Sequence, residues 1–233
     1  MSLVATESIV FDAVGTLIYP EPEVAVVYSQ VGRQFGSRLS QRKVSARFRA
    51  VFEELEVRDR AGELRTSEEF EFARWREIVG RVLDDSADSA GCFAELYAHF
   101  ARPSSWRVFP DVAPVFEELS SRGVKLALAS NFDRRLFEIT RQLQPLNLCS
   151  HIVVSSQVGY RKPHPEFFAA IAAAIGSAPE RIVYVGDDPE SDVAGARSVG
   201  MRAVLLDRRG QARASAIGSL KELLHDRCDC ADY

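Results

Sequence analysis

The chain has 233 residues, of which 46% are apolar and 27% are charged, a balance that excludes a disordered chain, a collagen-like protein and a small disulfide scaffold. Its 29 basic and 33 acidic side chains give a net charge of −4, so there is no basic field to bind nucleic acid or an anionic membrane. At roughly 150 residues per domain, the length fits one large domain, or one domain with an insert.

The cysteines and the apolar runs favour an intracellular protein. Cys92 and Cys149 lie far apart and far from the C-terminal pair Cys228 and Cys230, which argues against a disulfide framework. That pair has no second Cys pair nearby, and we interpret it as part of a frayed tail. The longest apolar run, 167–175, is too short to cross a bilayer, and the first residues lack the basic start of a signal peptide. We therefore expect a soluble, cytoplasmic protein with no membrane partner.

Five short segments rich in Val, Ile and Leu are typical of strands buried on both faces of a parallel sheet. In chain order they are Ser8–Asp12, Lys125–Asn131, His151–Ser156, Arg181–Asp187 and Arg202–Asp207. Helical patterns separate the later segments: Phe168, Ile171, Ala172 and Ile175 recur at helical spacing, after Pro165 in a first turn. This alternation predicts a doubly wound α/β fold with a parallel sheet.

The gap between the first two strands carries a different pattern. Between Pro20 and Pro103 there is little strand signal, and four apolar stripes recur at helical spacing. They are Val24, Val27, Tyr28, Val31 and Phe35; Val44, Phe48, Val51, Phe52 and Leu55; Trp75, Ile78, Val79 and Val82; and Phe93, Leu96, Tyr97 and Phe100. The stripes predict an inserted helical bundle. We place the α/β core domain at 1–18 and 106–233, and the helical domain at 19–105.

The position of this insert predicts its role. In a doubly wound sheet, ligands bind beyond the carboxyl ends of the strands. An insert that leaves the end of the first strand lies over that crevice. We expect it to act as a lid that excludes water and shapes specificity.

Polar side chains lie at or after the ends of four of the five predicted strands. They are Asp12 at the end of the first, Ser130 and Asn131 at the end of the second, Lys162 after the third, and Asp187, Asp188 and Asp192 at and after the end of the fourth. If the strands are parallel, these acidic residues converge on one crevice. Carboxylates that lie close together repel, and a proton or a cation must compensate their charge. Oxygen ligands of this kind suit Mg²⁺. Lys162, the Ser130 hydroxyl and backbone N–H groups would then hold a phosphoryl group, which Asp12 would attack.

With these motifs, the sequence resembles the haloacid-dehalogenase superfamily of hydrolases over essentially its whole length. The Asp-x-Asp-x-Thr motif of that family falls on 12–16, its second motif on Ser130, its third on Lys162 and its fourth on 187–192. The insert resembles the C1-type helical cap, and the core is expected to be Rossmann-like. The stretch 130–136 also resembles one subgroup, the dehalogenase-like hydrolase domain-containing protein 3 group.

The resemblance implies a role for each of these residues. Asp12 would be the nucleophile that becomes an aspartyl-phosphate, Ser130 would bind a phosphoryl oxygen, and Lys162 would neutralise both nucleophile and phosphate. Thr16 and Asn131 would support them, with Asn131 close to the substrate. The implied activity is a phosphatase acting on a small phosphorylated metabolite.

The resemblance also implies a magnesium site. Asp12, Asp187 and the backbone carbonyl of Val14 would bind Mg²⁺ directly. Asp192, with Asp188 beside it, would orient the water ligands of the ion. No other cofactor is implied.

Val14 departs from the family pattern. Phosphatases of the family carry a second Asp two residues after the nucleophile, which protonates the leaving alkoxide and then activates water. A valine can do neither, and such acid–base catalysis is worth roughly 10²–10⁴-fold. His99, on the last predicted helix of the insert, is one candidate for a replacement acid, although a packing role is the simpler interpretation.

Val14 therefore leaves three functions open. The first is a Mg²⁺-dependent phosphohydrolase that takes its acid from elsewhere, or whose leaving group needs none. The second is a 2-haloacid dehalogenase, which also lacks the second Asp, but works without metal and carries Ser and Asn where this chain is acidic. The third is a weakened relative that binds a phosphorylated ligand or a protein; the presence of Asp12, Lys162 and the acidic residues argues against it.

A further relative, the phosphonoacetaldehyde hydrolases, also lacks the second Asp while keeping Mg²⁺. Those enzymes need a lysine in the cap to form a Schiff base. Lys43 is the only lysine in the predicted insert, and its place on an amphipathic helix favours a solvated surface residue. The sequence leaves the substrate and the oligomeric state open.

Overall fold

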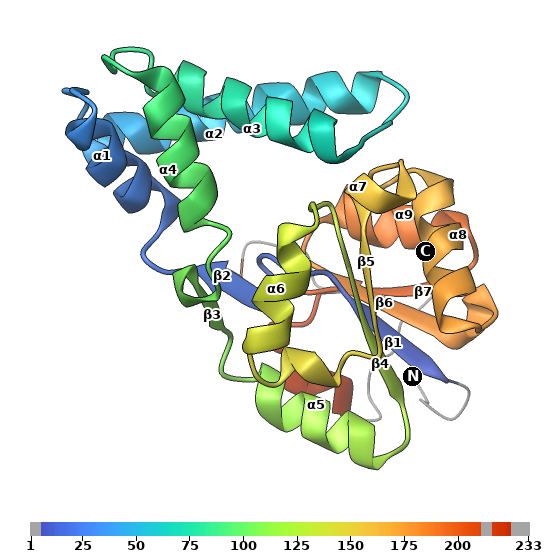
Figure 1. Cartoon of the computed structure of the whole chain (residues 1–233). Helices are drawn as coiled ribbons and strands as arrows, with labels where there is room; N and C mark the ends of the chain where they lie inside the picture. The colour runs from blue at the N-terminus through green and yellow to red at the C-terminus, as the bar shows by residue number, and fades with distance from the viewer. Residues whose placement is uncertain (1–5, 211–215, 225–233) are drawn as a thin grey trace.

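The computed structural model describes residues 6–210 and 216–224, so the pair Cys228 and Cys230 lies outside the described residues. An α/β core forms one part of the molecule, and a layer of four helices lies over one end of it (Figure 1). Among the described helices, none combines the length and the apolar character that a bilayer span requires.

The core is built on a five-stranded sheet in which every pair of neighbouring strands is parallel, in the order β5-β4-β1-β6-β7. The strands are β1 (Ser8–Phe11), β4 (Lys125–Ser130), β5 (His151–Val154), β6 (Ile182–Gly186) and β7 (Arg202–Leu205). Each falls inside a segment that the sequence predicted as a strand. The chain runs from β1 to β4 and β5, and then crosses to β6 and β7, so the doubly wound fold class is confirmed.

Alternate residues of the central strand enter two different apolar layers. Ile9 and Phe11 pack in a cluster with α5 (Val112–Ser121) and α6 (Arg135–Gln142). Val10, between them, packs in a second cluster with α8 (Pro165–Ile175) and α9 (Gly195–Ser198). Because both faces of β1 are buried, its sequence is a continuous apolar run rather than an alternation of polar and apolar residues.

Four helices form the helical insert, the name used below for residues 24–99. They are α1 (Val24–Gln34), α2 (Gln41–Ala61), α3 (Glu68–Val82) and α4 (Ser89–His99). Each carries one of the four predicted stripes, and the stripes meet in a third apolar cluster. Ser40, Ser67 and Asp88 cap three of the helices, since each side chain accepts a hydrogen bond from a backbone N–H of the first turn.

A short antiparallel pair that the sequence did not predict joins the insert to the core. It consists of β2 (Ile18–Pro20) and β3 (Trp106–Val108). Three residues are too few to show an apolar alternation, and Pro20 weakens any strand signal because it lacks an N–H. The rings of Tyr19 and Phe109 pack beside this pair, with centroids 4.7 Å apart.

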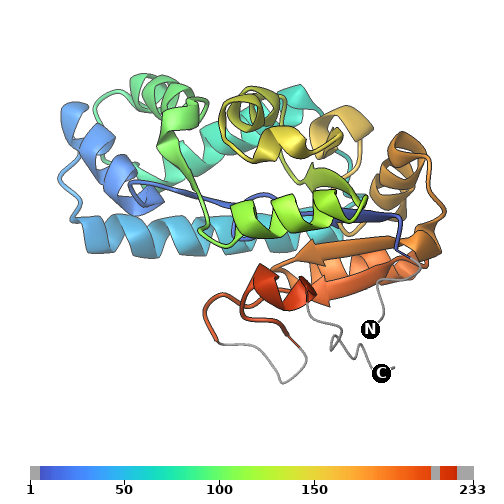
Figure 2. The same ribbon diagram turned by 90° about the horizontal axis from the view of Figure 1, so that it is seen from below.

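The insert contacts the core at its other end as well. The turn between α2 and α3 lies next to α7 (Ser155–Val158) in both views (Figures 1 and 2). There the Thr66 N–H donates to the Gly159 carbonyl at 3.0 Å, and the Arg161 N–H donates to the Leu64 carbonyl at 2.8 Å. The insert is therefore fixed at two places rather than hanging from a single hinge.

Asp111 ties the last described part of the chain to the core. Its buried carboxylate, beside the start of α5, accepts hydrogen bonds from Arg208 (3.0 Å), the Ser219 hydroxyl (2.8 Å) and the Leu220 N–H (2.8 Å). Burial raises the pKa of Asp111, but the hydrogen bonds and the charge of Arg208 outweigh it, and the pKa lies below its usual 3.8.

We predict that Asp111→Asn destabilises the protein at neutral pH by about 1.5–3 kcal/mol, since it removes hydrogen bonds to a charged group. The folded-state pKa lies below the unfolded one, so the stabilisation is complete above the unfolded pKa and is lost as the pH falls through the folded one. Urea unfolding of both proteins should therefore show a gap at pH 7 that shrinks below pH 3.8. A gap of the same size at pH 3 would contradict this account.

Candidate active site

Polar side chains lie at the same edge of the sheet after three neighbouring strands. Asp12 follows β1, Ser130 is the last residue of β4, and Asp187 follows β6. Because β1 pairs in parallel with both β4 and β6, the carboxyl ends of all three strands meet at one place. This is the edge at which doubly wound sheets bind their ligands.

Asp12 and Lys162 form the centre of the site. The Asp12 Oδ1 atom accepts hydrogen bonds from the Ser130 hydroxyl at 3.0 Å and from Lys162 Nζ at 2.7 Å. Lys162 Nζ also donates to Asp192 Oδ1 at 2.6 Å and to the Tyr184 hydroxyl at 3.1 Å. Lys162 is only 4% exposed, so its charge is matched by carboxylates rather than by water.

The charges around Lys162 keep it protonated. Burial by itself lowers the pKa of Lys162, but the negative charges of Asp12 and Asp192 outweigh this effect and raise the pKa well above its usual value of 10.5. The ammonium group is therefore a permanent cation beside Asp12 at physiological pH.

Two neighbours hold Lys162 in place. The Asn131 side chain accepts a hydrogen bond from the Lys162 N–H at 2.8 Å and donates to the Lys162 carbonyl at 3.3 Å. The Tyr184 hydroxyl, which accepts from the ammonium group, donates to the Ala129 carbonyl at 2.7 Å. Asn131 fixes the backbone of the lysine and Tyr184 fixes the end of its side chain.

Three carboxylates gather beside the lysine. Asp12, Asp187 and Asp192 each have an oxygen within 4.8 Å of the others. They pack against two glycines: a Cβ atom at Gly15 would lie 2.3 Å from an Asp187 oxygen, and one at Gly186 would lie 2.2 Å from an Asp192 oxygen. Gly15 also has a φ of +91°, a conformation that favours glycine. The acidic group therefore depends on glycine at both positions.

The residues of this acidic group fit a divalent cation. The Asp187 side chain reaches solvent, but the protein atoms around it, with the charges of Asp12 and Asp192, raise its pKa to about 7. Burial, with the charge of Asp12, also raises the pKa of Asp192 despite its contact with Lys162. One ammonium faces three carboxylates, and a cation would relieve the remaining repulsion. Carboxylate oxygens at this spacing suit Mg²⁺.

Asp188 lies outside this group of three. Its carboxylate accepts hydrogen bonds from the N–H groups of Glu190 (2.8 Å) and Ser191 (2.7 Å), and so caps the helical segment Pro189–Ala194. It also accepts a hydrogen bond from Arg60 of the insert, at 3.3 Å. Asp188 thus holds the loop that connects Asp187 and Asp192, two members of the acidic group.

Thr16 and Val14 flank Gly15 in different environments. Thr16 is fully buried, and its hydroxyl has no hydrogen-bond partner in the part of the chain that the structure describes. Its carbonyl accepts a hydrogen bond from Arg208 at 2.7 Å. The Val14 side chain is 37% exposed, so the position where relatives carry a second Asp is open to solvent and holds an apolar group.

His99 and Lys43 lie in the insert as the simpler interpretations predicted. The His99 ring packs against Phe100, with centroids 5.0 Å apart, and burial, with the charge of Arg102, lowers its pKa. A neutral, packed imidazole is a poor proton donor, and the packing role is confirmed. Lys43 is exposed in the first turn of α2, which confirms a solvated lysine.

The sequence analysis missed three residues around the site. Tyr184 lies in the middle of a strand that is buried throughout, and the signal that could have revealed it is that a buried hydroxyl needs a partner. Arg161, in the core loop that contains Lys162, contacts Glu56 of the insert, and Arg60 of the insert contacts Asp188 of the core. Their contacts join residues far apart in the sequence, and no local pattern predicts them.

Comparisons with known proteins identify the family of this chain. The family model for haloacid dehalogenase-like hydrolases matches residues 6–200. The haloacid dehalogenase-like hydrolase domain-containing protein 3 of Danio rerio is 30% identical over 206 residues, covering 86% of this chain and 85% of the relative. The phosphoserine phosphatase of Thermus thermophilus is 34% identical over 137 residues, covering 55% and 54%. The HAD phosphatase from Thermococcus onnurineus superposes with a TM-score of 0.67 at 25% identity, covering 94% and 96%.

This chain belongs to the haloacid dehalogenase-like hydrolase family. The resemblance seen in its motifs is thereby confirmed, including the likeness to the domain-containing protein 3 subgroup. Proteins named as phosphatases are among its relatives, and the chain is accordingly a hydrolase by family.

We predict that Asp187→Asn stabilises the metal-free protein while removing its response to Mg²⁺. The raised pKa of Asp187 means that its charge destabilises the fold, and this cost grows from pH 3.8 and is complete above about pH 7. At pH 8 in EDTA, the variant should melt about 2–4 °C higher than the wild type. This is the shift that about 1 kcal/mol of added unfolding free energy produces in a chain of this length. Mg²⁺ at 100 times its dissociation constant should stabilise only the wild type, by about 2.7 kcal/mol.

Asp84→Asn is the matched control for this measurement. Asp84 pairs with Arg47 on the surface of the insert, and an exposed pair of this kind contributes little to stability. The Asp84→Asn variant should melt at the same temperature as the wild type, both with and without Mg²⁺. If Asp187→Asn melts lower than the wild type in EDTA at pH 8, the carboxylates do not repel as the geometry indicates.

Proposed function

We propose that this protein is a Mg²⁺-dependent phosphohydrolase that acts on a small phosphorylated metabolite through an aspartyl-phosphate on Asp12. The observation that carries the proposal is the position of that one carboxylate. It contacts Lys162 and Ser130 directly, and it lies within 4.8 Å of Asp187 and Asp192. The phosphatases among the relatives support the same reaction.

In the first step, Asp12 attacks phosphorus and the bond to the leaving oxygen breaks, with its electron pair going to that oxygen. Lys162 and Ser130 both hold Oδ1, so we assign the attack to Oδ2. The Lys162 ammonium lowers the repulsion between the carboxylate and the anionic phosphate. The Ser130 hydroxyl would donate a hydrogen bond to a phosphoryl oxygen.

In the second step, water attacks the phosphorus of the aspartyl-phosphate. The bond between phosphorus and the Asp12 oxygen breaks, the carboxylate is restored, and a proton from the water passes to the released phosphate or to solvent. Lys162 stabilises the leaving carboxylate, as it stabilises Asp12 before the reaction. The enzyme returns to its starting state without any other reactant.

Asp12, Asp187 and the backbone carbonyl of Val14 would hold the magnesium ion in this proposal, and Asp192 would orient its water ligands. When bound, the ion supplies positive charge next to the transferring phosphoryl group. Asp188 would act through the loop that it caps.

Thr16 and Asn131 would be supporting residues, Asn131 through its hydrogen bonds to the Lys162 backbone. The residues 1–18 and 106–233 would form the catalytic core and 19–105 the cap over it. The cap would exclude water and select the substrate.

Val14 sets the type of leaving group in this proposal. With no proton donor two residues after the nucleophile, a leaving group that departs as a stable anion reacts without assistance, whereas an alkoxide does not. The same feature favours a second candidate, the 2-haloacid dehalogenase, because halide also leaves without a proton. The three-carboxylate group argues for the phosphohydrolase, since a metal-free dehalogenase has no use for it.

We predict Mg²⁺-dependent release of phosphate from p-nitrophenyl phosphate, and slower release from alkyl phosphates. EDTA should abolish both, and Asp12→Asn should abolish both because it removes the nucleophile. The measurement is phosphate release from a series of aryl and alkyl esters of graded leaving-group pKa, with halide release from 2-chloropropionate assayed in parallel. Metal-independent halide release would replace the phosphohydrolase by the dehalogenase, and a rate that does not depend on leaving-group pKa would refute the role given to Val14.

We predict that Val14→Asp accelerates alkyl phosphate hydrolysis by about 10²-fold, the lower end of the effect of a placed general acid, and p-nitrophenyl phosphate hydrolysis by much less. Val14→Asn is the matched control, since it has the shape of Asp without a transferable proton. The comparison is of kcat for each ester with all three proteins. An equal gain from Asn and Asp would show that polarity at this position, and not proton transfer, changes the rate.

A further inference from the structure

The last two turns of α2 contact both loops that carry the proposed catalytic residues. These turns hold Glu56, Asp59 and Arg60, and we call them the α2 end. One loop, 159–163, leads into Lys162. The other, 187–192, lies between the carboxylates of Asp187 and Asp192. Figure 1 shows this end of α2 on the same side of the molecule as α7 and α9, away from the β2–β3 pair.

Arg161, the residue before Lys162, is buried among carboxylates of the insert. Its guanidinium donates to Glu56 at 2.7 Å and to Glu71 at 3.0 Å, and lies 3.9 Å from Asp59. Adjacent residues thus project into opposite domains: Lys162 enters the active site, and Arg161 enters the insert.

The backbone of this loop is held by the same part of the insert. The Arg161 N–H donates to the Leu64 carbonyl at 2.8 Å, and the Thr66 N–H donates to the Gly159 carbonyl at 3.0 Å. Between them, Arg65 and Tyr160 form an antiparallel bridge. The segment before Lys162 therefore runs as a short two-stranded pair with the α2–α3 turn.

Arg60 makes the corresponding contact with the other loop. It donates to Asp188 at 3.3 Å and to the Ser191 hydroxyl at 3.1 Å, and it pairs with Glu190. The Asp188 N–H donates in turn to Asp192 at 3.0 Å. Arg60 is thus two hydrogen bonds away from a carboxylate of the acidic group.

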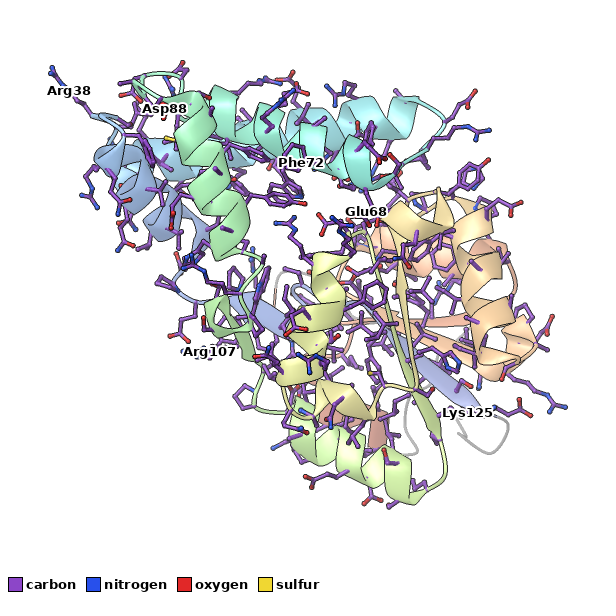
Figure 3. All side chains as sticks on the ribbon, in the orientation of Figure 1. Arg38, Glu68, Phe72, Asp88, Arg107 and Lys125 are labelled. Carbon is purple, nitrogen blue, oxygen red and sulfur yellow. The ribbon has the colours of Figure 1, made fainter. Side chains whose placement is uncertain are left out.

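A third contact lies at the start of α3. Glu68, labelled in Figure 3 between α3 and the core, accepts hydrogen bonds from the Ser156 hydroxyl at 2.6 Å and from the Arg134 N–H at 3.0 Å. The insert therefore reaches the segment after Ser130 as well as the other two loops. Its contacts converge on the active-site face of the core and not on a remote surface.

Stability alone does not account for these contacts. A partly exposed ion pair such as Arg60 with Asp188 contributes little to stability, and the attraction within a buried ion pair offsets the cost of desolvation only in part. The ion pairs of Arg60 and of Arg161 each fix the position of a loop. Because a misplacement of about 1 Å at a reacting group can cost about 10²-fold in rate, the position of these loops has a larger effect on catalysis than on the fold.

We propose that Arg60 and Arg161 are positioning residues, through which the docked α2 end sets the metal-binding loop and the place of Lys162. The inference rests on the proposed phosphohydrolase for its effect on rate. It makes the insert part of the active-site framework at this end. Assembly of the site then depends on docking of the α2 end.

Arg60→Gln tests the metal-binding loop, with Arg58→Gln as its control. Both arginines lie in the last turn of α2, but Arg58 pairs with Glu77 and Asp59 inside the insert. Calorimetry should show Mg²⁺ affinity about tenfold weaker for Arg60→Gln and unchanged for Arg58→Gln. Amide exchange at 187–192 should rise in the first variant alone. Equal behaviour of the two variants would overturn the proposal for Arg60.

Arg161→Lys tests the lysine loop, with Arg74→Lys as its control. Arg74 is buried with Glu56 (2.6 Å) and Asp59 (2.7 Å), so both variants lose a guanidinium on the same carboxylates. Of the two arginines, only Arg161 belongs to the loop that carries Lys162. Arg161→Lys should lower kcat by about 10²-fold with KM nearly unchanged, and Arg74→Lys should lower thermal stability without this loss of kcat. Equal losses of kcat would leave both residues with a structural role only.

Amide exchange at 159–163 and 187–192 separates this inference from the proposed function. The amide-exchange measurement needs neither metal nor substrate. Exchange that rises in Arg60→Gln and Arg161→Lys, but not in their controls, supports positioning even if the wild type releases no phosphate. Exchange that stays at the wild-type rate in both loops overturns positioning even if the wild type is an active phosphatase.

Discussion

The contact between Lys162 and Asp12 is the interaction on which the rest of the structure depends. An ammonium group that is 4% exposed persists only where carboxylates replace its water. Those carboxylates come from β1 and from the segment after β6, and the lysine comes from the loop after α7. The parallel order of β4, β1 and β6 brings these segments together, and Gly15 and Gly186 allow the close approach.

The helical insert is joined to this arrangement at two ends. The β2–β3 pair continues from the strand that carries Asp12, while the α2 end reaches the loop of Lys162 and the loop of Asp188. The buried charges at the second junction are arranged like those in the active site: Arg161 and Arg74 face Glu56, Asp59 and Glu71, as Lys162 faces its carboxylates. Both sets fix the loop at 159–163, from opposite sides. This loop therefore lies between the cluster around Asp12 and the docked insert.

Val14 separates two requirements that a single motif usually meets together. Asp12, Lys162 and the acidic group are all present in one place, so the groups that the proposed attack at phosphorus requires lie together. The proton donor is missing from its position, and His99 packs against Phe100 with a lowered pKa, which does not favour a role as an acid. The chemistry of the leaving group, rather than the strength of phosphate binding, is then the property by which this hydrolase would differ from relatives with a second Asp.

The sequence by itself determined the five strands, the four inserted helices and the residues at the strand ends, because continuous apolar runs, helical stripes and polar residues after strands are local patterns. It could not reveal β2 and β3, whose three residues are too short for any pattern, nor show that Asp188 caps a helical segment and contacts Arg60. The sequence could not reveal the role of Tyr184 either, because a tyrosine within an apolar run has the pattern of a core residue. Only the tertiary structure decided which charges meet, because Arg161 lies 105 residues from Glu56 in sequence and 2.7 Å from it in space.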